Sequence, residues 1–562
     1  MSAQGRPLPF VTPWNKFYWT SGADDRLRLQ ECESCSALIH PPKPVCPYCR
    51  GSRLGVRAVS GFATLFGFTV SHRFHLPGLP SPYIVAQVAV EEDPRVRLTT
   101  RLVDCEEGDL QLGMRMEVTF EQVEDVWLPL FRPAAEQPEP PEQYARPASL
   151  PPDEVPAERV RTLVRPAPRG RKFEDDVVLS GIGHSAIGRR LMVDPLSLTV
   201  EACQAAVAEA GLTMDDIDGL STYPGGGLEH GMGEGGITAL EAALRIRPTW
   251  FNGGGETFGP GGSVIAAMLA VSAGLARHVL CFRTVWQSTH DHLLRQGLLG
   301  GGGFGRVAGD MGWGMPFGAT SAAHVLAQTA QRHFHRYGTT RETLGWIALN
   351  QRANAALNPT AVYREPLTMD DYLSARMITT PFGLYDCDVP CDAAVAVVVS
   401  AAETAGDLRV RPVRVEAVGT QIIERLEWDQ STSTHEPQVL GPAAHLWSRT
   451  TLRPGDVDVA ELYDGFTFNC LSWIEALGFC GIGEAKDFLD GGKNIARDGV
   501  LPLNTHGGQL SHGRTHGMGL LHEAVVQLRG EGGARQVEGA RVAVVSSGGL
   551  TPSGVMLLRS DG

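Results

Sequence analysis

Residues 177–223 determine the fold class: they contain VVLSGIG (177–183), LSLTVEACQAAVAEAGL (196–212) and IDGLSTY (217–223), in that order. The first and third segments are short apolar runs of the kind that form buried strands. The second segment places its apolar residues at helical spacing. This succession of strand, helix and strand predicts a layered α/β fold.

The same succession continues toward the end of the chain. SVIAAMLAVSAG (263–274) is helical in pattern and leads into the apolar run HVLCFRTV (278–285). Later segments with the composition of buried strands are AAVAVVVSAAE (393–403), RVEAVGTQ (414–421), VAELYDGF (459–466) and RVAVVSS (541–547). An alternation sustained over nearly 400 residues indicates a large α/β unit.

The N-terminal part of the chain has a different pattern. Short β-rich runs separated by turns follow one another there: FATLFGFTV (62–70), YIVAQVAV (83–90), RLTTRLVDC (97–105) and MRMEVTFEQV (114–123). From Pro133 to Pro168 the chain then carries ten of its 37 prolines without apolar periodicity. Such a segment cannot bury enough apolar surface to fold, so we expect a semi-rigid linker between two units.

Composition limits the classes of function. Of the 562 residues, 43% are hydrophobic and 20% are charged, as in soluble globular proteins. No apolar run is long enough to span a membrane and the start MSAQGRPLPF lacks the features of a signal peptide, so we expect a cytoplasmic protein without a membrane partner. The net charge is −14, and residues 1–130 contain 13 Lys and Arg against 15 Asp and Glu, which disfavours binding to nucleic acid.

Four cysteines form two closely spaced pairs, Cys32 with Cys35 and Cys46 with Cys49. Each C-x-x-C pair can present two thiolates to one ion, and two pairs complete the tetrahedral sulfur site that is typical of structural zinc. Because such a site has no open position, we expect it to hold the segment folded and not to catalyse. Eleven cysteines in so long a chain do not indicate a disulfide scaffold.

Residues 10–133 resemble a zinc-ribbon/OB-fold family that accompanies thiolase-like acyl-CoA enzymes. The resemblance rests on FYWTSGADDRLRLQECESCSALIHPPKPVCPYC, GFATLFGFTVSHR, PYIVAQVAVEEDPRVRLTTRLVDC and the closing LPLFRP. It implies that this part of the chain pairs with a thiolase-fold unit and helps to accommodate an acyl-CoA. A unit of that kind follows directly in the same chain.

Residues 175–562 resemble the sterol-carrier-protein-x branch of the thiolase superfamily, and more closely its lipid-transfer-protein aldolases. The resemblance rests on YGTTRETLGWIALNQRANAALNPTAVYREPLTMDDYLSARMI, ELYDGFTFN and NTHGGQLSHGRTHGMGLLHEAVVQLRG. It implies a homodimer with five layers, in which central helices pack between two sheets. The expected regions are an N-terminal helix and zinc ribbon (1–57), an OB-fold barrel (58–132), the linker (133–172) and two thiolase-like halves (173–405, with a loop insertion, and 406–562).

All three catalytic groups of a thiolase are replaced in this chain. A thiolase has its cysteine nucleophile at a helix start, which lowers the pKa of the thiol; Thr257 is nearest that position, and no cysteine lies between Cys203 and Cys281. Ser546 stands where a second cysteine acts as acid and base, and Arg514 stands where the histidine of the Gly-His-Pro motif is expected. Hydroxyl groups are far weaker nucleophiles than a thiolate, so we do not expect ordinary thiolysis.

The aldolase branch also lacks the cysteine, and its Tyr-Asp-Gly-Phe motif is present here from Tyr463 and Asp464 onward, so both residues are candidates for a catalytic role. In the second motif of the branch, Gly-Tyr-x-His-Gly, Arg514 replaces the tyrosine and His516 is retained. The resemblance implies retro-aldol chemistry, in which Tyr463 takes a hydroxyl proton while Arg514 favours the phenolate or, with His516, holds the enolate oxygen. Further candidates for binding the oxyanion or the substrate are Thr257, Gly254, Gly255, Ser546, Gly548 and Gly549.

We therefore expect a carbon–carbon lyase that acts on a β-hydroxyacyl-CoA, with coenzyme A as part of the substrate and steroid side-chain thioesters as the nearest family precedent. One alternative is a thiolase or Claisen-type acyltransferase with an unrecognised nucleophile, which would depend on free CoA. The other alternative is a non-catalytic acyl-CoA-binding scaffold, which would be indifferent to changes at Tyr463 and Arg514.

Overall fold

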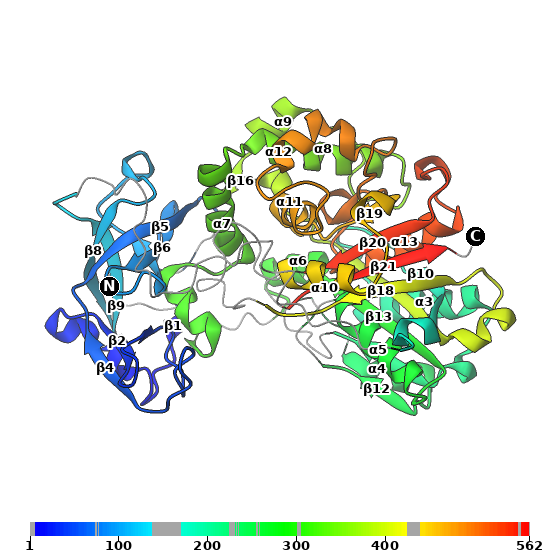
Figure 1. The fold of residues 1–562 in the computed structure, drawn as a ribbon, viewed down its shortest axis with the longest axis horizontal. Helices are drawn as coiled ribbons and strands as arrows, with labels where there is room; N and C mark the ends of the chain where they lie inside the picture. Colours follow the sequence, from blue (N-terminus) through cyan, green and yellow to red (C-terminus); the bar gives the residue numbers. More distant parts are fainter. Residues whose placement is uncertain are drawn as a thin grey trace.

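The computed structural model describes residues 6–73, 76, 78–137, 170–223, 231, 233, 235–254, 257, 259–299, 305–423, 439–548 and 552–560. Figure 1 shows a β-rich N-terminal body in blue and cyan beside a larger α/β body in green to red, with helix α7 (Ala322–Tyr337) between them. Most of the expected linker, 138–169, lies outside the described residues. In the described ranges no helix combines the length and the apolarity needed to span a membrane.

The N-terminal body begins with a three-stranded antiparallel sheet in the order β3-β2-β4. Cys32 is the last residue of β2, so the first C-x-x-C pair lies in the turn that leaves this strand. The second pair lies in the turns between β3 and β4. The elements of this ribbon are β1 (Leu8–Pro9), α1 (Lys16–Trp19), β2 (Arg28–Cys32), β3 (Leu38–Ile39) and β4 (Leu54–Ala58).

Five further strands form a closed barrel, because β5 pairs with both β6 and β8. Alternate residues of β6, among them Ile84 and Val88, face the apolar interior of the barrel. The other face of β6 is buried as well, since Tyr83 and Val85 pack against Ala319 of the larger body. The barrel strands are β5 (Phe62–Ser71), β6 (Tyr83–Val90), β7 (Arg97–Leu102), β8 (Arg115–Val123) and β9 (Val126–Pro133).

The larger body is built on nine strands in the order β12-β11-β13-β17-β10-β18-β21-β20-β19. The two halves of this sheet meet where β10 pairs with β18 at Val178↔Arg414 and Leu179↔Val413. Helix α3 packs on one half and α10 on the other, whereas α5 and α13 lie between the halves and α13 contacts strands of both. The layers are therefore helix, sheet, helices, sheet and helix, which confirms the five-layered thiolase fold predicted from the sequence.

Helix α3 (Pro195–Ala210) illustrates how local sequence positions a layer. The Asp194 carboxylate accepts a hydrogen bond from the backbone N–H of Ser197 at 3.0 Å and so caps the first turn. The helix then packs closely on β10, because a Cβ at Gly181 would lie 2.2 Å from the carbonyl oxygen of Ala206. A glycine at this position of the strand is required by the close approach of the helix backbone.

The helices of the larger body, besides α3 and α7, are α4 (Gly236–Leu244), α5 (Ser263–Ser272), α6 (Gln287–Arg295), α8 (Arg341–Ala356), α9 (Met369–Ser374), α10 (Leu440–Ser448), α11 (Thr467–Ala476), α12 (Ala485–Phe488) and α13 (Met518–Arg529). The strands of its sheet are β10 (Val177–His184), β11 (Gly219–Thr222), β12 (Trp250–Asn252), β13 (His278–Trp286), β17 (Asp392–Ala401), β18 (Val413–Gly419), β19 (Val459–Glu461), β20 (Val542–Ser547) and β21 (Gly554–Ser560). Three short strands lie outside this sheet: β14 (Arg306–Val307), β15 (Met377–Thr379) and β16 (Phe382–Gly383).

These three short strands join the two bodies. β14 pairs with β1, while β15 and β16 extend the barrel sheet, with Thr379 opposite Ser71 of β5. The hydroxyl oxygens of Thr69 and Thr379 are 2.5 Å apart, and the Tyr83 hydroxyl donates to the carbonyl oxygen of Gly318 at 3.0 Å. Strand pairing and buried polar contacts thus attach the barrel to the larger body of the same chain. The sequence did not predict this arrangement.

Candidate active site and metal centre

The four ribbon cysteines converge on one point. The Sγ atoms of Cys32 and Cys49 are 3.5 Å apart, those of Cys35 and Cys46 are 3.7 Å apart, and all four lie within 4.8 Å of one another. A tetrahedral zinc ion with bonds of about 2.3 Å holds its sulfur ligands roughly 3.8 Å apart. The cysteines therefore fit a single zinc ion with four thiolate ligands, as the sequence predicted.

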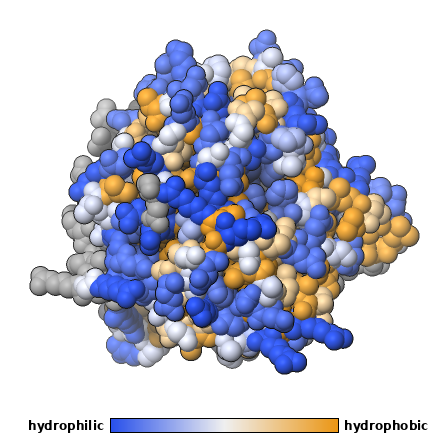
Figure 2. Space-filling view, turned by 90° about the vertical axis from the view of Figure 1, so that its right-hand side faces the viewer, coloured by the Kyte–Doolittle hydropathy of each residue, from blue (hydrophilic) through white to orange (hydrophobic). Residues whose placement is uncertain are grey.

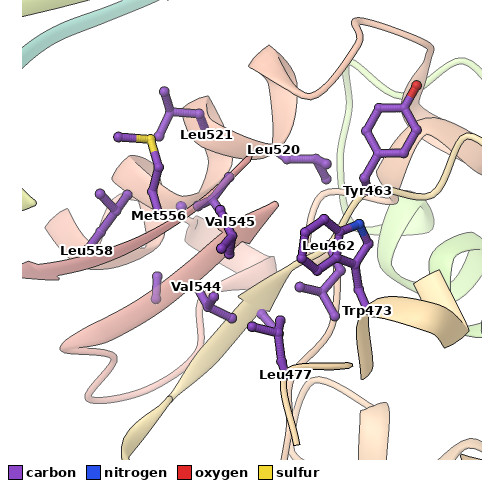
Figure 3. Packing of buried hydrophobic residues seen from close by; sticks show 14 of the residues in the cluster. Leu462, Tyr463, Trp473, Leu477, Leu520, Leu521, Val544, Val545, Met556 and Leu558 are labelled. Carbon is purple, nitrogen blue, oxygen red and sulfur yellow. The ribbon is translucent and has the colours of Figure 1, made fainter. Parts of the chain in front are cut away.

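Tyr463 lies two residues after the end of β19, which runs parallel to β20. Its backbone N–H donates to Ser546 Oγ on β20 at 2.8 Å, so the serine hydroxyl ties the loop after β19 to the neighbouring strand. Loops at the carboxyl ends of parallel strands form the ligand sites of many α/β folds. The Tyr463 side chain is buried, and Figure 3 shows its hydroxyl directed away from the apolar side chains of Leu462 and Trp473. The phenol oxygen is therefore turned out of the apolar core.

Arg514 is held by two side chains from other elements. Its Nε donates to Asp388 Oδ2 at 2.7 Å, and its Nη1 donates to Gln287 Oε1 at 2.8 Å. Burial disfavours the guanidinium charge, but the Asp388 carboxylate and the charge of Tyr463 outweigh it and raise the pKa of Arg514. The structure thus places Arg514 within electrostatic range of the Tyr463 phenol.

His516 is oriented by a second arginine. Arg283 of β13, a fully buried side chain, donates to His516 Nδ1 from Nη2 at 2.7 Å and from Nε at 3.2 Å. A guanidinium group has donors only, so Nδ1 must be the acceptor and the imidazole proton lies on Nε2. Burial, and then the charges of Arg283 and Arg514, hold the pKa of His516 well below its ordinary value. The ring is therefore a neutral imidazole that donates through Nε2.

Asp464 binds the segment of chain that leads to Arg514 and His516. Its Oδ1 accepts a hydrogen bond from the backbone N–H of Gln509 at 2.8 Å, and its Oδ2 accepts one from Gln351 Nε2 at 3.3 Å. Gln509 belongs to a π-helical turn, Gly508–His512, which ends two residues before Arg514. Burial raises the pKa of Asp464 to about 6, although these hydrogen bonds oppose the shift. One carboxylate oxygen of Asp464 therefore holds the turn, and the other is bound by Gln351 of α8.

The glycine-rich segment before α5 lies next to His516. A Cβ at Gly259 would lie 2.3 Å from the carbonyl oxygen of His516, and the Gly261 N–H donates to Ser547 Oγ at 3.1 Å. The other expected oxyanion and substrate residues have these places: Thr257 half-buried in a bend before α5, Gly254 exposed, Gly548 buried directly after β20, and Gly255 and Gly549 outside the described residues.

Three residues of the site were missed by the sequence analysis: Arg283, Asp388 and Gln287. For Arg283 a signal was present, because it is the one charged side chain within the apolar run HVLCFRTV, where a buried charge needs a partner. Asp388 and Gln287 lie in polar surroundings in the sequence, and no local pattern distinguishes them.

Three sequence families match the chain. The zinc ribbon matches "ChsH2, rubredoxin-like zinc ribbon domain" over residues 19–55, and the barrel matches "ChsH2, C-terminal OB-fold domain" over residues 56–121. Residues 431–558 match "Thiolase C-terminal domain-like". The N-terminal body is therefore similar to two ChsH2 families, and the C-terminal part of the larger body is similar to a thiolase family.

Named relatives are similar to the larger part of the chain. A "steroid side-chain-cleaving aldolase" of Thermomonospora curvata is 34% identical over 389 residues, which cover 67% of this chain and 97% of the relative. A "17-hydroxy-3-oxo-4-pregnene-20-carboxyl-CoA lyase" of Mycobacterium tuberculosis is 35% identical over 403 residues, which cover 67% and 97% of the two chains. A solved "Ltp2-ChsH2(DUF35) aldolase" structure superposes with a TM-score of 0.60 and 31% identity, covering 69% of this chain and 98% of the other.

A more distant structure shares the fold alone. It is a monomeric SCP2-thiolase-like protein of Mycobacterium smegmatis, with a TM-score of 0.50 and 17% identity over 71% of this chain and 79% of that one. The thiolase-like fold of the larger body is thus found at sequence identities too low to carry a statement about chemistry.

Proposed function

The chain belongs to the steroid side-chain-cleaving aldolases of the thiolase superfamily, and we propose that it cleaves a β-hydroxyacyl-CoA by a retro-aldol reaction with Tyr463 as the base. It is a carbon–carbon lyase of acyl-CoA thioesters, and its products are a ketone or aldehyde and a shorter acyl-CoA. The observation that supports the proposed mechanism is that Tyr463, Arg514 and neutral His516 lie close together in one region of the larger body.

The proposed step needs no covalent intermediate. The Tyr463 phenolate takes the proton of the β-hydroxyl group, and the electron pair of that O–H bond forms the carbonyl group of the first product. The Cα–Cβ bond breaks, and its electron pair becomes the enolate of the shorter acyl-CoA. Tyr463 then returns its proton to Cα, which balances the reaction and restores the phenolate. The same sequence in reverse is an aldol condensation.

Arg514 and His516 have different tasks in this proposal. A positive charge within contact range lowers the pKa of an acid by about one to three units. Arg514 supplies that charge for Tyr463, whose ordinary pKa of about 10 would leave it protonated at neutral pH. Asp388 reduces the effect, because it pairs with the guanidinium at 2.7 Å. His516 donates from Nε2 to the enolate oxygen of the thioester, which is an oxyanion-hole role.

Asp464 is proposed as a positioning residue and not as an acid or base. Its two oxygens hold Gln509 and Gln351, and the π-helical turn that follows leads to Arg514. Thr257, Gly254, Gly255, Gly548 and Gly549 stay candidates for binding the thioester oxygen or the substrate, and Ser546 supports the backbone of Tyr463.

A thiolase reaction would need a nucleophile. Cys391 contacts the site, since its Sγ donates to the carbonyl oxygen of Arg514 at 3.3 Å. Burial raises the pKa of this thiol to about 12, and the Asp392 carboxylate adds to the shift. Cys391 is therefore an uncharged thiol at neutral pH and a poor nucleophile.

The choice between lyase and thiolase is tested by omitting free CoA. Cleavage of a β-hydroxyacyl-CoA is expected to proceed without it, and intact-mass spectrometry of acid-quenched protein is expected to show no acyl adduct. An adduct, together with turnover only when free CoA is added, would mean a thiolase or Claisen-type reaction.

Substitution of Arg283 tests the role of His516. In Arg283→Met the Nδ1 atom loses its donor, so the proton redistributes between the two nitrogens and fewer molecules carry it on Nε2. We expect kcat/KM to fall by at least about tenfold, since loss of one oxyanion donor costs 10²–10³. Loss of a neighbouring positive charge also raises the pKa of His516, so the ring becomes protonated at a higher pH than in the wild type.

The measurement is the imidazole ¹⁵N spectrum of histidine-labelled protein as a function of pH, with His516 assigned from a His516→Gln variant. Arg283→Lys is the matched control: it keeps a charge and a donor, and we expect it to recover part of the activity. If Arg283→Met left both the tautomer and the titration of His516 unchanged, Arg283 would have a structural role only.

We also propose a homodimer formed through the larger body. β12 is an edge strand that pairs only with β11 in the described part of the chain, and its Phe251 is 65% exposed. An unpaired apolar edge is suited to pairing with a second copy. The view of the larger body in Figure 2 shows a mainly hydrophilic surface interrupted by apolar patches.

Phe251→Lys is therefore expected to convert dimers to monomers in light scattering coupled to size exclusion. Phe10→Lys, at an exposed phenylalanine of the ribbon, is the control and is expected to leave the mass unchanged. A mass of two chains in Phe251→Lys would place the interface elsewhere, and a wild-type mass of one chain would rule out the dimer.

A cytoplasmic location is the last proposal from the sequence. All eleven cysteines lie in the described part of the chain, and no disulfide joins any of them. Thiols that stay reduced are typical of a reducing compartment. Fractionation of cells with a cytoplasmic marker tests this location.

A further inference from the structure

The π-helical turn Gly508–His512 helps to fix the place of Arg514. The N–H of Val389 donates to the carbonyl oxygen of Gln509 in the turn at 2.9 Å. The carbonyl oxygen of Val389 in turn accepts from the N–H of Arg514 at 3.1 Å. A shift of the turn therefore moves Val389 and with it the backbone of Arg514. The contacts that hold the turn thus bear on the active site.

His512, the last residue of the turn, is buried and bound through one ring nitrogen. Its Nε2 lies 3.2 Å from Thr360 Oγ1, which lies 2.9 Å from Asn358 Oδ1. The Asn358 amide nitrogen donates to the carbonyl oxygen of His506 at 3.0 Å, so Oδ1 is an acceptor and the Thr360 hydroxyl must donate to it. The Thr360 oxygen is then left to accept from His512. The proton of a neutral His512 therefore lies on Nε2.

The second ring nitrogen of His512 is an acceptor without a donor. The ring packs edge-on against His506, with 4.8 Å between the ring centroids. Burial, and then the charge of His506, hold the pKa of His512 well below its ordinary value, so the imidazole is neutral. In the described part of the chain Nδ1 has no hydrogen-bond partner. A buried acceptor of this kind is destabilising unless a donor reaches it.

His512 lines a cavity of about 30 Å³. Helix α13 and strand β10, which contact each other in the larger body (Figure 1), supply part of its wall. A water molecule needs about 10–15 Å³ of such space and about two to four polar partners. The cavity therefore has room for water and groups to bind it. The other charged and titratable residues that line it are His506 of the same loop, His184 of β10, His522 and Glu523 of α13, and Arg535 beyond α13.

We propose that His512 is a positioning residue of the active site, and that one water molecule bound in this cavity donates to its Nδ1 atom. The imidazole is then held at both nitrogens, by Thr360 and by the water. Because His522 and Glu523 line the same cavity, the water also ties the end of the turn to α13. The inference rests on the proposed function for the importance of Arg514, and on the geometry of the cavity for the water site.

The test fills the cavity and leaves every polar group in place. Val395 of β17 lines the cavity, and Val395→Ile adds one methylene group there, which displaces the water. Val397→Ile is the matched control, because it makes the same change two residues along the same strand, on the same face and outside the cavity lining. A general effect of overpacking the core would appear in both variants.

The readouts are the ¹⁵N signal of His512 Nδ1 in histidine-labelled protein, assigned from His512→Asn, and amide hydrogen exchange in residues 508–512. In Val395→Ile we expect the Nδ1 signal to move toward that of an acceptor without a donor. We expect exchange in the turn to become about fivefold faster and kcat/KM to fall about fivefold, the effect of one neutral hydrogen bond. Val397→Ile is expected to match the wild type in all three measurements.

His512 itself is tested by two substitutions. His512→Asn keeps an acceptor near the place of Nδ1 and is expected to stay within about threefold of the wild-type kcat/KM, whereas His512→Phe keeps only a ring and is expected to lose about tenfold. An equal loss in both variants would make His512 a packing residue and overturn the proposal.

The water site has its own contrary outcomes. It would be overturned if Val395→Ile matched Val397→Ile in the Nδ1 signal and in exchange. A wild-type Nδ1 signal that depends on chloride concentration would put an anion in the cavity and overturn it as well. A wild type that cleaves no thioester would refute the lyase, while the ¹⁵N signal and the exchange rates would still decide on the water.

Discussion

Tyr463→Phe is expected to lower the rate of carbon–carbon cleavage about 1,000-fold, within the range of 10²–10⁴ that a positioned acid or base contributes. The substitution removes the oxygen that takes the β-hydroxyl proton and keeps the ring. The hydroxyl is turned out of the apolar core, so its loss creates no cavity among the packed side chains (Figure 3). The backbone hydrogen bond from Tyr463 to Ser546 is also preserved, because it does not involve the side chain.

Affinity for the acyl-CoA is the companion measurement. We expect the dissociation constant of a CoA thioester to change by less than about threefold, because a phenol that acts on the reacting atoms contributes chiefly in the transition state. Tyr337→Phe at the end of α7 is the matched control outside the site and is expected to cleave at the wild-type rate. A near wild-type rate in Tyr463→Phe would remove this tyrosine from the mechanism.

Cys32→Ser is expected to unfold the zinc ribbon. Zinc binding at sites with four protein ligands supplies about 10–16 kcal/mol in small ribbon and finger domains, and three thiolates hold the ion much less tightly. The ribbon has a small apolar cluster of its own, built around Cys32, Ala37, Ile39 and Cys46, so loss of the metal leaves little to keep it folded. We therefore expect the zinc content per chain to fall to a small fraction of the wild-type value.

The readouts are metal analysis and limited proteolysis of residues 19–55. Cys105→Ser is the matched control, because this half-buried cysteine lies outside the cluster of four sulfurs. It is expected to retain the wild-type zinc content and the wild-type cleavage pattern. Full zinc content in Cys32→Ser would show that the ion is bound elsewhere.

The fold was predictable from the sequence to the extent that its signals are local. Alternating strand and helix patterns, the C-x-x-C pairs and the β-rich segment each lie within short windows, and the structure and family matches confirm the ribbon, the barrel and the thiolase-like layers. The attachment of the barrel to the larger body of the same chain was not predictable. It depends on Thr379 pairing with Ser71 and on the contact of Tyr83 with Gly318, 235 residues away. Nothing in a strand as short as β15 indicates its partner.

The candidate active site, too, was predictable from the sequence only in part. Tyr463 and His516 belong to motifs that the sequence displays, and the structure places both beside Arg514 in a loop region shared by β19, β20 and the start of α13. The groups that orient them are distant in sequence. Arg283 is 233 residues from His516, and Asp388 is 126 residues from Arg514. Such pairs follow from the stacking of the layers, which a single sequence does not encode locally.

Mass spectrometry of the products is the measurement that tests the lyase most directly. Purified protein is incubated with branched and steroidal β-hydroxyacyl-CoAs in the absence of free CoA. The retro-aldol reaction predicts a ketone or aldehyde together with an acyl-CoA shortened by the same carbon atoms. No cleavage of any β-hydroxyacyl-CoA, with turnover of β-ketoacyl-CoAs only when free CoA is supplied, would contradict it and establish thiolysis in its place.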